Sequence, residues 1–256
     1  MIGFILGTSE GKNILKYINR FTDEVVVSTA TEYGGELLKK YKFKHLNTKP
    51  LDKDGLVNLI NKFNIKVLVD ASHPYAKEVS KNAIDSAKEC NIDYIRYERL
   101  GVLKESNYKK ISYISGYDEL KDTIKNIDGN ILNTTGSRNI ETIYNLNIKN
   151  RIIHRILPSA KILQDVLNIG VKVEDVIAIK GPIGYELNRA FINQYSAKAL
   201  ITKDSGKAGG TIEKLKACMD ENIDIIVIDK PKIEYGITFS DEKELVDYLI
   251  DKYNLV

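Results

Sequence analysis

The chain has 256 residues and a formal net charge of +3, and it is 43% hydrophobic and 29% charged. This composition is typical of a soluble globular protein, and the length allows one large or two small domains. The weak charge, without a run of like charges, argues against nucleic acid as a partner, and no apolar run reaches the roughly 20 residues that span a membrane.

The first residues, MIGFILGTSEGK, contain an apolar run of about five residues, which is shorter than the roughly 7–15 of a signal peptide. Cys90 and Cys218 are isolated and lack the spacing of metal ligands. We therefore expect both thiols to be reduced, and we expect no metal site. Together these features predict a cytoplasmic protein with neither a membrane nor a nucleic-acid partner. We expect a monomer, but the sequence does not fix the oligomeric state.

Short apolar runs alternate with amphipathic segments along the whole chain. The expected strands are residues 2–6, 24–28, 66–70, 93–97, 110–114, 130–134, 151–155, 176–180, 198–202 and 224–229. Helical patterns lie between most of them, as in 76–90, where apolar residues recur with a period of 3.6. Continuous apolar strands separated by helices predict parallel sheets covered on both faces. Ten strands are many for one sheet, so we expect two α/β domains, 1–128 and 129–256, divided at the Asp128-Gly129 turn.

The first expected strand ends in a glycine-containing turn, Gly7 to Gly11, which is followed by a helical pattern. Ligands of parallel sheets bind outside the carboxyl ends of the strands, and a glycine turn at a helix N-terminus offers backbone N–H groups to phosphate. The turn is not a complete G-x-G-x-x-G, so a plain turn with Ser9 as the helix cap remains an alternative.

The second expected strand ends in Ser28-Thr29-Ala30-Thr31, with no acidic residue before Glu32. NAD-binding folds place a carboxylate on the ribose near this point, whereas hydroxyl groups tolerate a 2′-phosphate. If a dinucleotide binds, this segment favours NADPH over NADH. The alternative is that Ser28 and Thr29 only end a strand.

The segment VDASHPYAKEV places one of the three histidines, His73, between an expected strand and an expected helix. Pro74 fits the first position of that helix, where no backbone N–H is needed, and it holds His73 extended. The proline is explained by local structure, but the histidine is not. This corner is therefore either a structural joint or part of a working site.

Six blocks of the sequence occur in the order found in one known family. They read LGTSEGK, STATEYGGELL, VDASHPYAKEVSKNAIDSAKECNIDYIRYER, NTTGSRNI, IKGPIGYELN and ITKDSGKAGGTIEKLKA. In these blocks the chain resembles the precorrin-6A reductases, and the His-Pro and Lys-Asp-Ser-Gly blocks are the specific ones. Leu6 stands where many members have a glycine, and Ile183 stands where an aromatic residue is usual, which bears on packing against the substrate.

The resemblance implies two Rossmann-like domains with mainly parallel sheets and an active-site cleft between them. The N-terminal domain would bind NADPH, and the C-terminal domain would contribute to substrate binding. The implied reaction is reduction of one C=C bond of precorrin-6A, or of its cobalt form, to precorrin-6B during assembly of the corrin ring of cobalamin. Whether cobalt is required stays open. The substrate would be a tetrapyrrole fringed with carboxylates, which calls for Arg and Lys at the site.

The resemblance also assigns site residues. The expected cofactor-binding residues are Gly7, Thr8, Ser9, Glu10, Gly11, Ser28, Thr29, Thr31, Gly34, His73 and Pro74. The expected substrate-binding residues are Tyr75, Arg96, Arg99, Gly136, Ser137, Arg138, Gly181, Pro182, Lys203, Asp204, Ser205, Gly209 and Gly210. The catalytic candidates are His73 and Asp204, either of which could protonate the carbon next to the hydride acceptor, as water could; His73 could instead only contact the cofactor.

Three alternatives remain open from the sequence. Each cation near a strand end, including Lys180, Lys207 and Lys214, could be an ordinary solvated charge. The chain could be an NADPH-dependent reductase of another substrate, or a carrier of anions or corrinoids without enzymatic activity. The glycine-rich segment TKDSGKAGG lacks the Gly-Lys-Ser/Thr order of a phosphate-binding loop, so nucleoside triphosphate binding is not supported.

Overall fold

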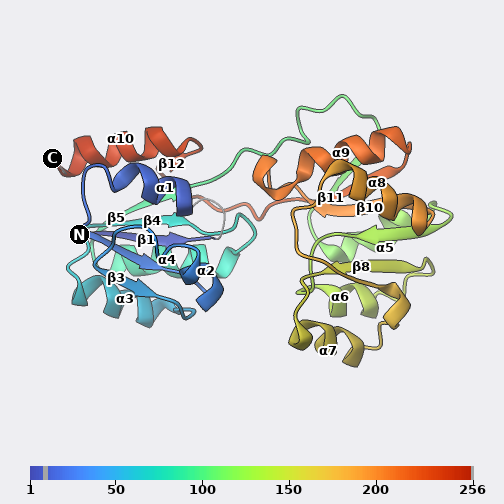
Figure 1. The fold of residues 1–256 in the computed structure, drawn as a ribbon, viewed down its shortest axis with the longest axis horizontal. Coiled ribbons are helices and arrows are strands. Elements are labelled where there is room, and N and C mark those ends of the chain that lie inside the picture. Colours follow the sequence, from blue (N-terminus) through green and yellow to red (C-terminus); the bar gives the residue numbers. More distant parts are fainter. Residues whose placement is uncertain (8–10, 255–256) are drawn as a thin grey trace. The chain divides into compact units, whose positions relative to one another are not determined.

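The computed structural model describes residues 1–7 and 11–254, and it forms two compact units (Figure 1). Unit 1 comprises Met1–Arg99 together with Pro231–Val256, and unit 2 comprises Leu100–Lys230. The expectation of two α/β domains is confirmed. The expected boundary at 128/129 is wrong, because Asp128-Gly129 lies inside unit 2, between helix α5 (Leu120–Ile124) and strand β7 (Asn130–Asn133).

The last residues of the chain belong to unit 1 again, so no single division of the chain separates the two units. Strand β12 (Thr238–Phe239) pairs with strand β5 (Asp93–Tyr97) of unit 1, and helix α10 (Glu242–Tyr253) packs against helix α1 (Gly11–Ile18). Strand β6 (Ile111–Ile114) pairs with strand β11 (Asp224–Ile228) of unit 2. Local periodicity in a sequence carries no information about such a return.

The sheet of unit 1 has the strand order β12-β5-β4-β1-β2-β3, and every pairing among its described strands is parallel. Its remaining strands are β1 (Ile2–Leu6), β2 (Val25–Ser28), β3 (His45–Asn47) and β4 (Val67–Ala71). Residues of α1 and α10 bury one face of this sheet, and residues of helices α3 (Lys53–Lys62) and α4 (Lys77–Glu89) bury the other. Helix α2 (Glu32–Glu36) follows β2.

The sheet of unit 2 has the order β6-β11-β10-β7-β8-β9, again with only parallel pairings among the described strands. Its remaining strands are β8 (Ile152–Ile156), β9 (Val176–Ala178) and β10 (Ala197–Lys203). Helices α8 (Tyr185–Gln194) and α9 (Thr211–Asp220) pack on one face, and α5 and α6 (Ile140–Asn145) pack on the other. Helix α7 (Ala160–Asn168) extends the core on the side of α6.

In both sheets, the order in which the chain adds strands reverses at a defined point, although the strands stay parallel. In unit 1 the chain runs from β1 through β2 to β3 on one side and continues with β4 and β5 on the other. In unit 2 it runs from β7 through β8 to β9, and then continues with β10 and β11. The switch points therefore lie between β1 and β4 and between β7 and β10. In open α/β sheets, ligands bind at the carboxyl ends of the strands that flank such a point.

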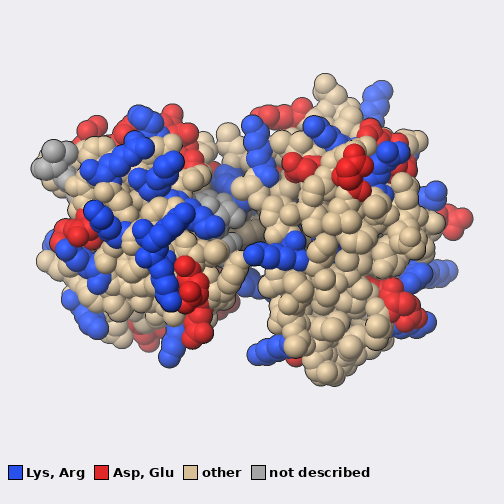
Figure 2. All heavy atoms as spheres, viewed as in Figure 1, with Lys and Arg blue, Asp and Glu red and all other residues tan. Residues whose placement is uncertain are grey.

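All ten expected strands are present, and the sequence missed only β3 and β12 among the described strands. Both are short, and β3 reads His-Leu-Asn, which lacks an apolar run. No helix in the described ranges is long and apolar enough to cross a membrane. Figure 2 shows charged side chains of both signs on the visible face of each unit.

Candidate active site

The His73 corner follows β4 at the switch point of unit 1. Ala76 N donates to His73 O at 2.8 Å, so residues 73–76 form a tight turn with Pro74 at its second position. Helix α4 begins only at Lys77, so the expectation that Pro74 opens the helix is wrong. His73 is exposed, and its Nδ1 accepts a hydrogen bond from Tyr75 N at 3.3 Å. A neutral ring that accepts at Nδ1 carries its proton on Nε2, the form that can donate.

A buried ion pair supports this corner. Arg96 Nη1 lies 2.8 Å from Asp70 Oδ1, and both side chains are fully buried. Tyr94 Oη donates to Asp70 Oδ2 at 2.9 Å, and Ser72 N donates to Asp70 Oδ1 at 2.9 Å. Burial, together with the Asp70 carboxylate, raises the pKa of Tyr94, so its hydroxyl stays protonated. Arg96 Nη2 also donates to Ser72 O at 3.1 Å, which joins the ion pair to the residue before His73.

This network corrects the expectation that Arg96 binds substrate. Arg96 is 0% exposed, and its Cζ lies 5.0 Å from the centre of the Tyr235 ring. Tyr235 belongs to the segment that returns to unit 1. Arg96 therefore holds the corner in place and does not present a charge to a ligand. Arg99, further along the same segment, is partly exposed.

Strand β1 lies on the other side of the same switch point and is followed by Gly7. Gly7 N donates to Ala71 O at 3.1 Å, which ties Gly7 to the end of β4. A Cβ at Gly11 would lie 3.0 Å from Leu6 Cδ1, so a side chain there would crowd the start of α1. The expected cofactor residues Thr8, Ser9 and Glu10 lie outside the described residues.

The end of β2 presents hydroxyl groups, as expected. Asn47 Nδ2 donates to Ser28 Oγ at 3.0 Å, and Thr29 Oγ1 donates to Thr31 O at 3.0 Å. Thr31 caps α2, since its Oγ1 accepts from Gly34 N at 3.1 Å. Ser28 and Thr29 are buried and Thr31 is exposed, so Thr31 is the one of the three that a ligand can reach directly. The sequence missed Asn47, because it lies in the polar strand β3.

The β7 loop flanks the switch point of unit 2. Asn133 is 0% exposed, and its Oδ1 accepts from Thr135 N at 3.1 Å and from Thr135 Oγ1 at 2.8 Å. Its Nδ2 donates to His154 Nδ1 at 3.0 Å, and burial lowers the pKa of His154 to about 4. His154 is therefore a neutral acceptor that fixes the Asn133 amide. Beyond this network, Gly136 has φ +86°, and Ser137 and Arg138 follow, with Arg138 exposed.

The β10 loop lies on the other side of this switch point. Asp204 is 5% exposed, and its carboxylate accepts from Val102 N at 3.1 Å, Leu103 N at 2.9 Å and Gly206 N at 3.3 Å. These bonds anchor the start of unit 2 and give Asp204 a structural role, while its expected role as proton donor stays a prediction. Burial, and then the nearby Arg138, lower the pKa of Lys203. The charge of Arg138 therefore acts on Lys203 across this switch point.

Two glycine-containing loops pack against each other beside Lys203. A Cβ at Gly210, which has φ +68°, would lie 2.9 Å from Pro182 Cβ, so the 181–184 loop and the start of α9 are in contact. A Cβ at Gly209 would collide with Ser205 Oγ. Ile183 is 8% exposed and points into unit 2, which does not support the expectation that it contacts substrate.

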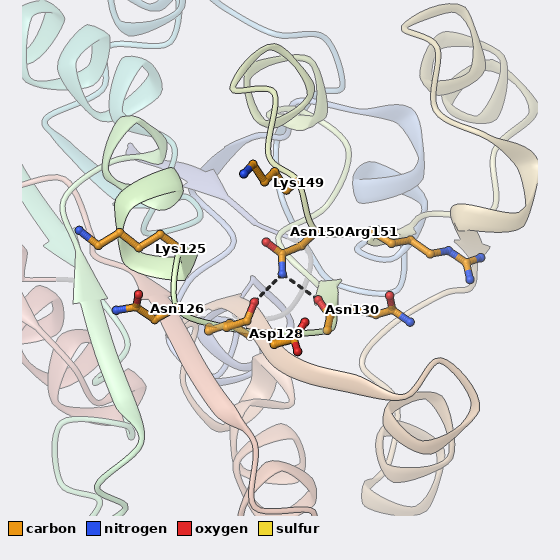
Figure 3. Close-up of a pocket in the computed structure, with 9 residues that line it drawn as sticks. Lys125, Asn126, Asp128, Asn130, Lys149, Asn150 and Arg151 are labelled. Atoms are coloured by element: carbon orange, nitrogen blue, oxygen red, sulfur yellow. Dashed lines mark hydrogen bonds between the residues drawn. The ribbon is translucent and has the colours of Figure 1, made fainter.

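The structure thus groups the expected residues on two edges, each within its own unit. Gly7, Thr31 and His73 belong to the carboxyl edge of unit 1, and Arg138 and Lys203 to that of unit 2. A hollow of about 440 Å³ in unit 2 lies at the opposite end of its sheet, where β7 begins. There Asn150 Nδ2 donates to Ile127 O at 2.7 Å and to Gly129 O at 2.8 Å (Figure 3). None of the expected site residues lines this hollow.

Comparison with known proteins identifies the family. The sequence profile of the family described as precorrin-6x reductase CbiJ/CobK matches residues 2–250. The chain belongs to this family of reductases. It is 35% identical over 244 residues to the cobalt-precorrin-6A reductase of Methanocaldococcus jannaschii, covering 95% of each chain. It is 33% identical over 255 residues to that of Priestia megaterium, covering 98% of this chain and 99% of the relative.

The fold agrees with this family. A solved structure of the precorrin-6A reductase CobK superposes with a TM-score of 0.76 at 15% identity and covers 98% of this chain and 96% of its own. The expected family is therefore confirmed, and the chain is an oxidoreductase by family. The two parallel α/β units are the family fold.

Proposed function

We propose that this protein reduces a C=C bond of cobalt-precorrin-6A, or of precorrin-6A, with NADPH, in the assembly of the corrin ring. The observation that carries the substrate is the similarity over the full length of two relatives that bear the name cobalt-precorrin-6A reductase. Neither relative's name supports the two alternatives, a reductase of another substrate and a carrier without activity.

The residues of unit 1 fit a dinucleotide. At the switch point of unit 1, β1 ends at Leu6 and α1 begins at Gly11, and a strand that leads into a helix at such a point is the arrangement that binds pyrophosphate. The end of β2 presents Thr31 and carries no carboxylate between Ser28 and Thr31, so a 2′-phosphate meets no like charge there. The first feature fits either dinucleotide, and the second favours NADPH over NADH. When bound, this cofactor supplies the hydride, and the protein contributes orientation and electrostatics.

His73 is proposed to act at the reacting end of the cofactor. It follows the strand beside the switch point, it is exposed, and the Asp70–Arg96 pair holds the residues before it. A neutral ring with its proton on Nε2 can donate to the macrocycle carbon next to the hydride acceptor, or it can orient the nicotinamide amide. The Asp204 carboxylate accepts from three backbone N–H groups, which favours His73 or water over Asp204 as the proton donor.

Unit 2 is proposed to hold the carboxylates of the tetrapyrrole. Arg138 and Lys203 act on each other electrostatically at its switch point, and exposed Lys180 and Lys207 lie in the loops that follow β9 and β10. A carboxylate bound between two such cations would form charge-assisted hydrogen bonds with them.

The test is to follow nicotinamide absorbance and the macrocycle spectrum while the full-length protein is given NADPH or NADH with cobalt-precorrin-6A or the metal-free substrate. Oxidation of NADPH that is stoichiometric with loss of the macrocycle chromophore supports the proposal. Macrocycle binding without oxidation of either cofactor identifies a carrier, and oxidation only with an unrelated substrate identifies a different reductase.

A further inference from the structure

A buried and a partly buried cation of unit 2 have only neutral hydrogen-bond partners. Lys214 of α9 is 5% exposed, and its Nζ donates to Thr202 Oγ1 at 2.9 Å. Arg155, at the carboxyl end of β8, donates from Nη1 to Asn188 Oδ1 at 3.0 Å. Within residues 1–7 and 11–254, neither side chain forms an ion pair. A buried charge is costly unless an opposite charge compensates it, so this arrangement disfavours the free protein.

The charges around Lys214 also leave its positive charge without full compensation. Burial, followed by the charge of Arg155, lowers the pKa of Lys214 to about 7, and burial lowers the pKa of Arg155 to about 10. Asp204 and Glu213 act in the opposite direction on Lys214, but more weakly. The Asp204 carboxylate is already bonded to the backbone of Val102 and Leu103. The surroundings therefore favour an added negative charge.

The start of α9 adds further donors beside these cations. Thr211, its first residue, is 0% exposed, and its hydroxyl has no hydrogen-bond partner among the described residues. Gly210 precedes it and supplies no side-chain cap, so the first N–H groups of this ten-residue helix are uncapped by a side chain. A helix N-terminus with a lysine and an arginine close by is a typical arrangement for binding an anion.

The loops of the candidate site lie against the same point. Asn188, the partner of Arg155, donates from Nδ2 to Ile183 O at 3.1 Å and to Gly184 O at 2.9 Å, which fixes the 181–184 loop. Thr202, the partner of Lys214, directly precedes Lys203 on β10. The cations therefore lie beneath the loops to which substrate binding is assigned, and Arg155 is only partly buried, which gives a ligand a way in.

We propose that Arg155, Lys214 and the first turn of α9 form an oxyanion subsite that takes a carboxylate group of the substrate. That the carboxylate belongs to the tetrapyrrole rests on the proposed function; that an oxyanion binds here rests on the side chains alone. A carboxylate is favoured over a cofactor phosphate, because the features that fit a dinucleotide lie in unit 1. Glu213 Oε2, buried without a hydrogen-bond partner in the same turn, is a like charge that weakens binding.

The first test is thermal unfolding of the full-length protein titrated with succinate or with inorganic phosphate at constant ionic strength. Succinate should raise the melting temperature of the parent. Lys214→Met should melt higher than the parent without any anion and should bind succinate at least tenfold more weakly. Lys216→Met, which removes an exposed lysine of the same helix, should respond as the parent does, and Glu213→Gln should bind succinate more tightly.

Arg155→Met tests the same subsite independently if Lys214→Met does not fold. The proposal is overturned if Lys214→Met and Arg155→Met retain the succinate response of the parent. A response to phosphate alone that both substitutions abolish would overturn the carboxylate assignment in favour of a phosphate site.

Steady-state kinetics separate this inference from the proposed function. In the reductase assay, Lys214→Met should raise the KM for the macrocycle at least tenfold and leave the KM for NADPH unchanged. An unchanged KM for the macrocycle in both variants overturns the subsite even if the protein is a reductase. A succinate response that depends on Lys214, in a protein that reduces no macrocycle, supports the anion site and refutes the proposed function.

Discussion

Arg96→Met should destabilise unit 1 and loosen the His73 corner. The substitution leaves the Asp70 carboxylate fully buried with Tyr94 and Ser72 as its remaining hydrogen-bond donors. Removing one partner of a buried ion pair costs about 3–5 kcal/mol of unfolding free energy. For a chain of this size each kcal/mol corresponds to about 2–4 °C, so the melting temperature should fall by about 6–20 °C.

The assay is urea unfolding followed by circular dichroism, with melting curves in parallel. The matched control is Lys252→Met, which breaks the exposed pair between Lys252 and Asp93 of the same strand β5 and should change stability little. The double variant Asp70→Asn/Arg96→Met removes both buried charges and should recover part of the loss. A loss below about 1 kcal/mol in Arg96→Met would refute the view that this pair supports the corner.

Three further outcomes follow from the described contacts. The pKa of His154 falls from near 6.5 to about 4 on folding, so the unfolded chain binds a proton at a higher pH than the folded chain does. The unfolding free energy should therefore drop by up to about 3 kcal/mol as the pH falls from about 6.5 to about 4. A His154→Gln variant whose stability depends on pH as that of the parent does would contradict this. Thr31→Asp retains a helix cap but adds a negative charge at the end of β2. Binding titrations should therefore show weaker binding of NADPH, with binding of NADH little affected. An equal loss of affinity for both cofactors would place the 2′-phosphate elsewhere. His73→Ala should lower kcat by roughly 10²-fold if the ring is the proton donor, or mainly raise the KM for NADPH if it only orients the cofactor; parental kinetics with a lower melting temperature would make the corner a structural joint.

Much of the fold could be predicted from the sequence, because its strands are buried on both faces and read as apolar runs. The ten expected strands and the parallel class rest on this signal. Strand β3, with the sequence His-Leu-Asn, gives no such signal, and the pairing of β12 with β5 joins residues far apart in the chain. The domain boundary failed for the same reason, since periodicity reports local structure and not the return of the C-terminal segment.

The candidate site was predicted less completely. Motifs at strand ends located the His73 corner and the Lys203 loop, because the carboxyl ends of parallel strands are where ligands bind. They could not separate an exposed cation from a buried one, and Arg96 was therefore assigned to substrate while it pairs with Asp70 inside unit 1. Arg155 lies within an ordinary strand, β8, and only its neutral partner and its electrostatic effect on Lys214 single it out.

Transfer of hydride from the cofactor to the macrocycle is the central claim, and isotope labelling tests it most directly. NADPH deuterated at its transferable position is mixed with cobalt-precorrin-6A and the full-length protein, and the product is analysed by mass spectrometry. The account predicts one deuterium in a macrocycle that has lost one C=C bond, with an equal amount of NADP⁺ formed. A reduced macrocycle without deuterium, or an unchanged macrocycle beside unoxidised NADPH, would contradict it.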